Sequence, residues 1–583
     1  MRKSILFLIT TLAFISCKIE KEASDFDFTT TFEKSEGKQT ATYEEVVRFY
    51  ENLAEAYPSV KMRNSGRTDS RERLKMVTIN PSPETNLDKV KEDKNIILIN
   101  NGIHPGESDG IDATMMLFRD IAQGKIDMPK NTVLATIPVY NIGGALNRNS
   151  GSRTNQNGPE EYGFRGNARN YDLNRDFIKA DTWNASAFAR IFHILRPDVF
   201  IDNHVSNGAD YQYTLTHLFT QHNKLGGELG NYLHTELMPS LETDLASKKW
   251  DITPYVNVYN RTPDKGFSQF MDSPRYSTGY TTLWNTLGMM VETHMLKPYK
   301  QRVEGTYELM KSMIEIVERD HEKIKSLRKD PYKKFLEKET YPIGWQLDTT
   351  KSSTLYFKGY EGEMITSEVT GLPRLKYDQN KPFTKEIPYQ NYFKTTKEIT
   401  IPEAYLIPRP WKRIIDRLEV NEIEMEYIED DVDMEVEVYH IDSYQTYNRP
   451  YEGHYPHYNT TVTNTTETVS IKKNSYLKVK TDQPGLRYIL ETLEPEAVDS
   501  FFNWNFFDTI LQQKEGFSAY VWEDEAAKLL AENAELKSKF EKKKQNDEKF
   551  AASSYQQLDW LHKKSDNYEK AHMRYPIYRV LKK

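Results

Sequence analysis

His104-Pro105-Gly106-Glu107 places a histidine and a carboxylate three residues apart on a turn that contains glycine. The segment follows the apolar run 96–99 and precedes a helix-like stretch over 109–122. A remote imidazole, His204, comes just after a second apolar run, 199–201. Two ligands close in sequence and a third far away, each at a strand end, are typical of a catalytic zinc site with one open position. These residues predict a zinc hydrolase.

A zinc hydrolase also needs a base and groups that hold the substrate. Glu292 follows the apolar run 288–291 and is the candidate base, although such a carboxylate is also typical of a strand that reaches solvent. Asn174 and Arg175 can bind a carboxylate, because a guanidinium presents its donors as a fork. An arginine between Asn174 and Asp176 is otherwise typical of a surface ion pair.

Several of these residues occur in an order found in a known family. They are His104, Glu107, the segment Asp172-Leu173-Asn174-Arg175-Asp176, His204 and Glu292. This ordered set resembles the carboxypeptidase A-like zinc metallocarboxypeptidases, and the resemblance covers residues 40–325. It implies an exopeptidase that hydrolyses the C-terminal bond of peptides with a free terminal carboxylate.

The resemblance also implies a catalytic role for each matching residue. His104, Glu107 and His204 would bind one Zn²⁺ per chain and leave one position for water. Glu292 would take the proton of that water and later pass it to the leaving amine.

Substrate-binding roles follow from the same resemblance. Asn174 and Arg175 would hold the terminal carboxylate. Arg165 would polarise the scissile carbonyl, and Tyr276 would close over the substrate. Each of the last two has competitors nearby in the sequence, namely Arg148, Arg153 and Arg169 for Arg165, and Tyr280 for Tyr276.

Other polar residues near these motifs have more than one interpretation. Asp202 and Asn203 either fix the tautomer of the next histidine or are polar groups at a strand end. Thr282 lies near where the family reads the substrate side chain, and an uncharged residue there gives no reason to expect strict preference for basic residues. His454 and His457 are a possible second metal pair, but the missing third ligand favours a surface loop.

The rest of the chain predicts three further regions. Between residues 70 and 330, apolar runs alternate with amphipathic stretches, which predicts an α/β domain over 39–330 with a mixed twisted sheet covered by helices. A β-rich accessory region, interpreted as a small sandwich, follows over 331–500, and a helical C-terminal segment over 501–583. The net charge of −8 does not favour general attraction to nucleic acid.

The N-terminus predicts export. Arg2 and Lys3 precede an apolar stretch that ends at Cys17, the only cysteine of the chain. Residues 1–17 resemble a bacterial lipoprotein signal peptide, which implies that the protein is secreted. The resemblance also implies that lipid on Cys17 anchors the protein to a bacterial outer or cell-surface membrane, at its periplasmic or extracellular face. Residues 18–38 are polar and predict a flexible tether.

Two other functions remain open from the sequence. A zinc amidase or endopeptidase acting on cell-wall peptides would share the metal ligands and Glu292. A surface binding lipoprotein without turnover would use the β-rich region and its tyrosines, but it would have no physical reason to retain Glu292 and Arg165.

Overall fold

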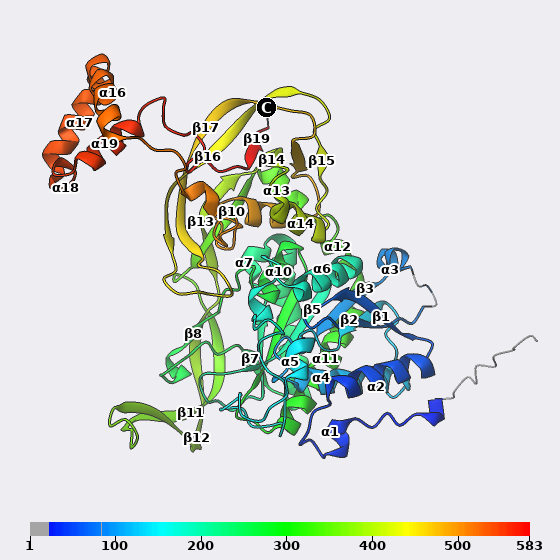
Figure 1. The fold of residues 1–583 in the computed structure, drawn as a ribbon. Coiled ribbons are helices and arrows are strands. Elements are labelled where there is room, and N and C mark those ends of the chain that lie inside the picture. The colour runs from blue at the N-terminus through cyan, green and yellow to red at the C-terminus, as the bar shows by residue number, and fades with distance from the viewer. Residues whose placement is uncertain (1–22, 83, 85, 583) are drawn as a thin grey trace, which may run out of the picture.

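The computed structural model describes residues 23–82, 84 and 86–582 (Figure 1). The predicted signal peptide over residues 1–17, with Cys17, lies outside these residues. Within the described part of the chain, no helix combines the length and the apolar character needed to cross a membrane.

An eight-stranded mixed sheet forms the first domain, in the order β1-β2-β4-β3-β5-β9-β6-β7. Its strands are β1 (Val60–Arg67), β2 (Arg73–Ile79), β3 (Asn95–Asn100), β4 (Thr132–Ile137), β5 (Val199–Ser206), β6 (Leu215–Phe219), β7 (Ile252–Pro254) and β9 (Leu287–His294). The central run β4-β3-β5-β9 is parallel, and antiparallel pairs flank it. The predicted α/β fold with a mixed sheet is confirmed.

Helices bury both faces of this sheet, because successive side chains of a strand point to opposite sides. On β3, Ile96 and Leu98 join a core that includes α6 (Trp183–Leu195) and α10 (Ser277–Leu283). Ile97 and Ile99 join the opposite core. The helices in that core include α2 (Tyr43–Ala56), α4 (Asp109–Ala122), α9 (Met238–Ser247) and α11 (Tyr299–Arg319).

The described part of the predicted tether, residues 18–38, packs against the first domain. Phe28 and Phe32 are buried in the same core as α2, and Phe32 belongs to the short helix α1 (Thr31–Lys34) of this segment. Arg119 Nη1 lies 2.6 Å from Glu33 Oε2. The tether prediction is wrong for these residues, because a few phenylalanines anchor a segment whose average composition is polar.

The accessory region contains a six-stranded sheet, in the order β15-β18-β14-β19-β16-β17. Its strands are β14 (Ala404–Pro408), β15 (Glu426–Tyr427), β16 (Val432–Thr446), β17 (His457–Ile471), β18 (Tyr476–Lys480) and β19 (Tyr578–Val580). One face packs with α14 (Lys412–Val420) and α15 (Leu486–Leu493) in the same core as α6 and α10. The region is β-rich as predicted, but its core is continuous with that of the first domain instead of closing on itself as a small sandwich.

Two smaller sheets join the accessory region to the first domain. β10 (Thr340–Leu347) pairs with β13 (Phe393–Thr400). The long hairpin of β11 (Ser353–Thr366) and β12 (Pro373–Gln390) pairs with β8 (Phe267–Ser268) and extends away from the body of the molecule (Figure 1). Two helices connect the first domain to the accessory region, α12 (His321–Leu327) and α13 (Lys333–Lys338). The described part of the first domain also contains the short helices α3 (Leu87–Asp93), α5 (Ile142–Leu146), α7 (His222–Leu225) and α8 (Gly227–Tyr232).

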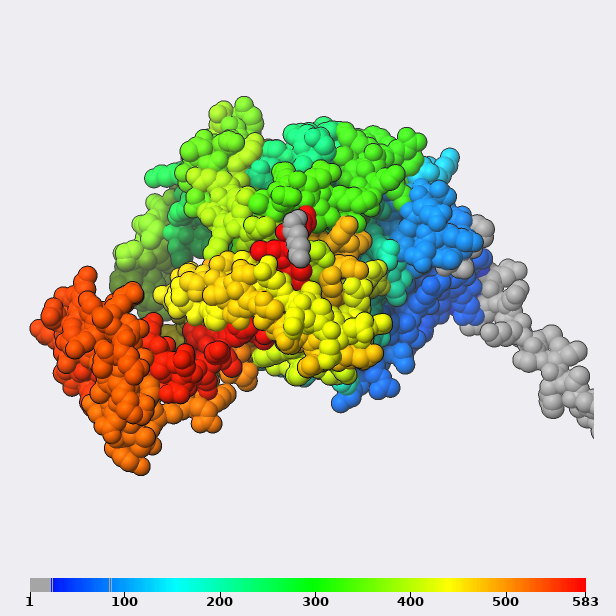
Figure 2. All heavy atoms as spheres, turned by 90° about the horizontal axis from the view of Figure 1, so that it is seen from above, coloured from blue at the N-terminus to red at the C-terminus, as the bar shows by residue number. Residues whose placement is uncertain are grey.

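The C-terminal segment is helical, as predicted, but its end returns to the accessory sheet. Four helices share a separate small core: α16 (Ala519–Glu532), α17 (Ala534–Asn546), α18 (Glu548–Ala551) and α19 (Ser554–His562). They form a lobe at one side of the molecule, on the other side of the accessory region from the N-terminal part (Figure 2). After α19, strand β19 inserts between β14 and β16, so the lobe is an insertion ahead of the last strand.

A buried ion pair holds α11 against the start of α4. The Arg302 side chain is fully buried, and its Nε donates to Asp109 Oδ2 at 2.9 Å. The guanidinium also donates to the carbonyls of Asn157, Gly158 and Lys297. Asp109 stands two residues after Glu107, so this pair fixes the helix start beside the predicted metal ligands.

Arg302→Met should lower the free energy of unfolding by about 3–5 kcal/mol, because Asp109 would be left as an uncompensated buried charge. Urea titration followed by fluorescence measures the change. Arg319→Met is the matched control, because Arg319 is 58% exposed in its pair with Asp320 and such surface pairs contribute about 0–1 kcal/mol. Equal midpoint shifts for both variants would contradict the structural role of Arg302.

Candidate active site

The predicted metal ligands meet at the carboxyl ends of two adjacent parallel strands. β3 ends at Asn100, and the loop that follows carries His104 and Glu107. β5 is the parallel neighbour of β3 and carries His204 near its end. Gly110, in the first turn of α4, allows the helix to lie close to β5, because a Cβ there would lie 2.3 Å from Asn203 Cβ.

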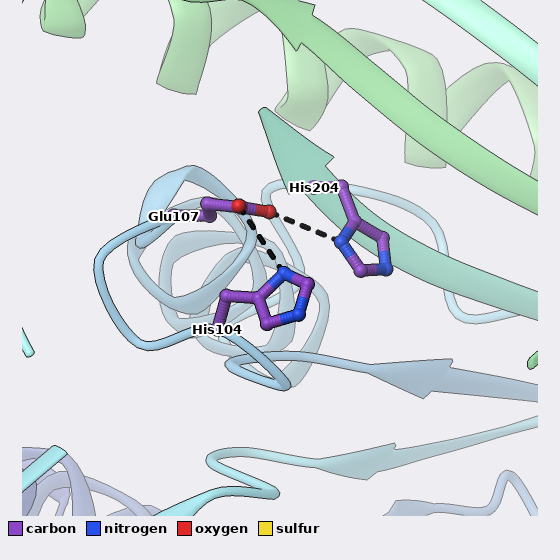
Figure 3. A group of neighbouring side chains, drawn as sticks. All are labelled: His104, Glu107 and His204. Atoms are coloured by element: carbon purple, nitrogen blue, oxygen red, sulfur yellow. Dashed lines mark hydrogen bonds and ion pairs between the residues drawn. The ribbon is translucent and has the colours of Figure 1, made fainter. Parts of the chain in front are cut away.

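The three side chains point at one another (Figure 3). His104 Nδ1 lies 3.2 Å from Glu107 Oε1, and His204 Nδ1 lies 3.0 Å from Glu107 Oε2. All three residues are buried, and one ligand atom of each lies within 4.8 Å of the others. The structure therefore brings together the three residues that the sequence assigned to the metal.

Two aspartates hold the far side of the imidazoles. Asp172 Oδ1 lies 2.9 Å from His104 Nε2, and Asp202 Oδ2 lies 2.9 Å from His204 Nε2. A carboxylate at Nε2 keeps the proton on that nitrogen and leaves the Nδ1 lone pair for a metal. Asp202 thus has the tautomer-fixing position considered for it, whereas Asn203 donates to Asn101 Oδ1 at 2.7 Å.

The donor set fits Zn²⁺. His104 Nδ1 is buried without a hydrogen-bond partner among the described residues, as expected for an atom that coordinates a cation. Two imidazole nitrogens and one carboxylate are a ligand set of catalytic zinc, which keeps a further position open. Burial opposes the ionised form of Glu107, but the charges of Arg153 and His104 hold the pKa of that carboxyl well below its usual range. Glu107 is therefore ionised, as a ligand must be.

Glu292 lies beside the ligands because of the strand register. β5 and β9 are parallel neighbours, and His204 is the Cα partner of Glu292. Burial raises the pKa of Glu292 to about 8, with the charge of His204 opposing the rise and the charge of Glu107 adding to it. A carboxylate whose pKa lies near neutral is suited to accept a proton and return it.

Two arginines line the same cleft as Glu292. Arg165, the predicted carbonyl-polarising residue, lines the cleft and lies 2.8 Å from Asp172 Oδ2 and 3.6 Å from Glu107 Oε1. Its competitor Arg153 also lines the cleft, and its Nη1 lies 2.6 Å from Glu107 Oε1. The other two competitors, Arg148 and Arg169, are not among the residues that line the cleft.

The predicted substrate-binding residues line the same cleft, whose volume is about 510 Å³. Arg175 lies with its Cζ 4.5 Å from the centroid of the Tyr276 ring. Asn174 Oδ1 accepts a hydrogen bond from the backbone N–H of Ser277 at 3.1 Å. Tyr280, the alternative to Tyr276, is buried in the core and donates to Asn421 Oδ1 at 2.6 Å. Of these two tyrosines, Tyr276 is the one that lines the cleft.

The two histidines of the accessory region contact aspartates and are not exposed. His454 Nε2 lies 2.6 Å from Asp181 Oδ2, and His457 Nε2 lies 3.1 Å from Asp508 Oδ1. Both imidazoles are largely buried. The surface-loop interpretation is wrong, because each histidine packs against an aspartate from another part of the chain.

Sequence reasoning gave no role to Asp172 or Asp272, and it considered Arg153 only as a competitor of Arg165. Asp172 stood in the quoted motif, two residues before Asn174, so its charge was a signal that could have been read. Arg153 and Asp272, which also line the cleft, follow no local pattern. Their positions depend on how distant loops meet.

Comparisons with known proteins agree with this geometry. Residues 46–194 match the sequence model of the family described as zinc carboxypeptidase. Proteins named carboxypeptidase 2 from Trichophyton equinum and Trichophyton tonsurans are 22% and 21% identical, each over 72% of this chain and 75% of the relative.

Solved structures of metallo-carboxypeptidases are also similar to part of the chain. The structure from Burkholderia cenocepacia has 16% identity over 48% of this chain and 70% of its own, with a TM-score of 0.37. The structure from Pseudomonas aeruginosa has 12% identity over 49% of this chain and 70% of its own, with a TM-score of 0.37.

The family match spans the segment that carries His104, Glu107 and Arg175. That match and the two relatives show that this chain is similar to zinc carboxypeptidases.

Proposed function

We propose that the protein is a zinc-dependent exopeptidase that hydrolyses the C-terminal peptide bond of peptides. One observation carries this proposal. The metal-ligand set, the base candidate Glu292 and the pair Asn174-Arg175 all line a single cleft. A substrate held there by its terminal carboxylate has its last peptide bond near both the ligands and the base.

The cofactor and Glu292 would divide the chemistry. Zn²⁺, when bound by His104, Glu107 and His204, supplies the positive charge that acidifies water and polarises the scissile carbonyl. Glu292 accepts the proton of the attacking water and returns it to the leaving amine. Arg165 and Arg153 present guanidinium groups on the cleft wall, where they stabilise the negative charge that develops on the carbonyl oxygen.

Arg175 binds the terminal carboxylate of the substrate, and this contact makes the reaction an exopeptidase reaction. A guanidinium binds a carboxylate through two parallel hydrogen bonds. The stacked Tyr276 ring and the neighbouring Asp172 hold the Arg175 side chain. Binding at this one point fixes the distance from the chain end to the cleaved bond.

The two alternatives lack such an observation. A cell-wall amidase or endopeptidase would use the same ligands and Glu292 but has no need of Asn174 and Arg175 in the cleft. A binding lipoprotein without turnover has no need of Glu292 beside the ligands. The family match and the carboxypeptidase relatives do not favour either one.

We also propose that the protein is exported and anchored by lipid on Cys17 to a bacterial outer or cell-surface membrane. The support is the basic, apolar and small-residue pattern of residues 1–17. The anchor would present the active site at the periplasmic or extracellular face, where peptide substrates are encountered.

Glu292→Gln should lower kcat by about 10²–10⁴-fold with zinc still bound, because the amide cannot accept the proton. The rate at which a C-terminal residue is released measures kcat, and mass spectrometry measures the zinc content. His204→Ala should instead lose zinc together with activity, since one protein ligand disappears. Glu322→Gln, at an exposed site on α12, is the control. Full activity of the Glu292 variant would show that the base is another residue.

Arg175→Ala should lower kcat/KM for a peptide with a free C-terminus by about 10²–10³-fold, the cost of removing one partner of a buried charged pair. The same peptide with a C-terminal amide should be a poor substrate for both proteins. Arg190→Ala, on the exposed side of α6, controls for loss of an arginine. Equal cleavage of the amidated and free peptides by the natural protein would support the endopeptidase alternative.

Cys17→Ser should move the protein from the membrane fraction to the soluble fraction of a bacterial host, because the lipid attachment site is lost. Immunoblots of the two fractions, with an unrelated lipoprotein as a marker, measure the distribution. An unchanged membrane fraction would rule out Cys17 as the anchor.

A further inference from the structure

The connection between β16 and β17 reaches from the accessory region to the active site. Glu452, in this connection, accepts a hydrogen bond through Oε2 from the backbone N–H of Asp172 at 2.8 Å. The next residue, Gly453, packs directly on Tyr171, because a Cβ there would lie 2.8 Å from the Tyr171 hydroxyl oxygen. Two residues of the accessory region therefore contact the chain just ahead of the substrate-binding pair. No role assigned above includes them.

Asp172 connects three parts of the site through its carboxylate. Its Oδ1 lies 2.9 Å from His104 Nε2 and accepts a hydrogen bond from the backbone N–H of Asn174 at 2.9 Å. Its Oδ2 accepts a hydrogen bond from Arg165 Nε at 3.0 Å. The hydrogen bond from Asn174 caps the short 3-10 turn Leu173–Arg175. A displacement of Asp172 would therefore move the residues that bind the substrate carboxylate.

The backbone of Glu452 has a conformation that side chains disfavour. Glu452 and Gly453 both lie in the left-handed region, with φ of 49° and 78°. For a residue other than glycine this conformation costs about 1–2 kcal/mol. Such strain persists where the surrounding structure fixes the residue, and it is concentrated at functional sites. The hydrogen bond to Asp172 gives a physical reason for a glutamate at this strained position.

Contacts on both sides of Glu452 hold the connection in place. Tyr451 stacks on Trp504, with the ring centroids 6.1 Å apart and the planes at 21°. On the other side, His454 Nε2 lies 2.6 Å from Asp181 Oδ2. Because both neighbours are anchored, the Glu452 carboxylate is presented to the first domain from a fixed position.

We propose that Glu452 is a positioning residue of the exopeptidase. It holds the backbone of Asp172 and thereby fixes the pair Asn174-Arg175, which binds the terminal carboxylate of the substrate. The inference rests on the proposed function of that pair. A binding group that is already held in place loses less conformational freedom when the ligand binds, so affinity increases. Glu452 is not among the residues that line the cleft, so it acts through Asp172 and not on the substrate.

Glu452→Ala should raise KM for a peptide with a free C-terminus by about 10–100-fold, as expected for the loss of a hydrogen bond to a charged group. The value of kcat should stay within about threefold of the natural one, because a loss of substrate binding alone changes KM. The strand register still holds Glu292 beside His204. Glu452→Gln keeps an acceptor oxygen on a side chain of the same length and should restore the natural KM.

Glu339→Ala is the matched control. Glu339 is also a glutamate in the left-handed region, with φ of 59°, and it is exposed at the end of α13 and does not line the cleft. This variant should leave KM and kcat unchanged. A peptide with a C-terminal amide is the second control, because it offers no carboxylate to the pair Asn174-Arg175. Its slow cleavage should be the same in Glu452→Ala and in the natural protein.

The possible outcomes separate this inference from the proposed function. An unchanged KM in Glu452→Ala would overturn the role of Glu452 and leave the exopeptidase function in place. The same holds if Glu452→Gln behaves like Glu452→Ala, or if Glu452→Ala loses activity equally on the free and the amidated peptide. Failure of the natural protein to release a C-terminal residue would overturn the exopeptidase function and the inference with it.

Discussion

The site depends on a buried carboxylate–histidine network, which runs from Asp172 through His104, Glu107 and His204 to Asp202. Folding removes three carboxylates and two imidazoles from water here. Each buried ion destabilises the folded state by several kcal/mol unless an opposite charge and hydrogen bonds balance it. Both Nε2 atoms are satisfied by aspartates, so the Nδ1 atoms and the central carboxylate converge on one point. A divalent cation held at that point by His104, Glu107 and His204 would balance the charge.

The accessory region supports this network from outside the first domain. Glu452, in the connection between β16 and β17, accepts a hydrogen bond from the backbone N–H of Asp172 at 2.8 Å. His454 pairs with Asp181, and Arg275 Nη2 lies 2.7 Å from Asp499 Oδ1. These contacts hold the segments that carry Asp172 and Tyr276. The second half of the chain is therefore part of the framework of the site, and its core is continuous with the core beneath α6 and α10.

Residues that follow a local pattern could be predicted from the sequence, and those that depend on tertiary contact could not. His104 and His204 follow apolar runs, and parallel strands place their carboxyl ends at one edge of a sheet. Asp272 and Glu452 reach the site from loops with no such pattern. The expected sandwich failed for a related reason, since a strand's alternation shows that one face is buried but not what covers it.

Strand register fixes the base more firmly than the substrate-binding groups. Glu292 is the partner of His204 on one side and of Thr216 on the other, and Thr216 Oγ1 donates to its carbonyl at 2.8 Å. A slip of one residue would turn Glu292 to the opposite face, so two strand ladders must both fail before the base moves. Arg175 ends a short 3-10 turn, and Tyr276 precedes α10. Short segments outside the sheet therefore position these two side chains, whereas the strand register positions Glu292 beside His204.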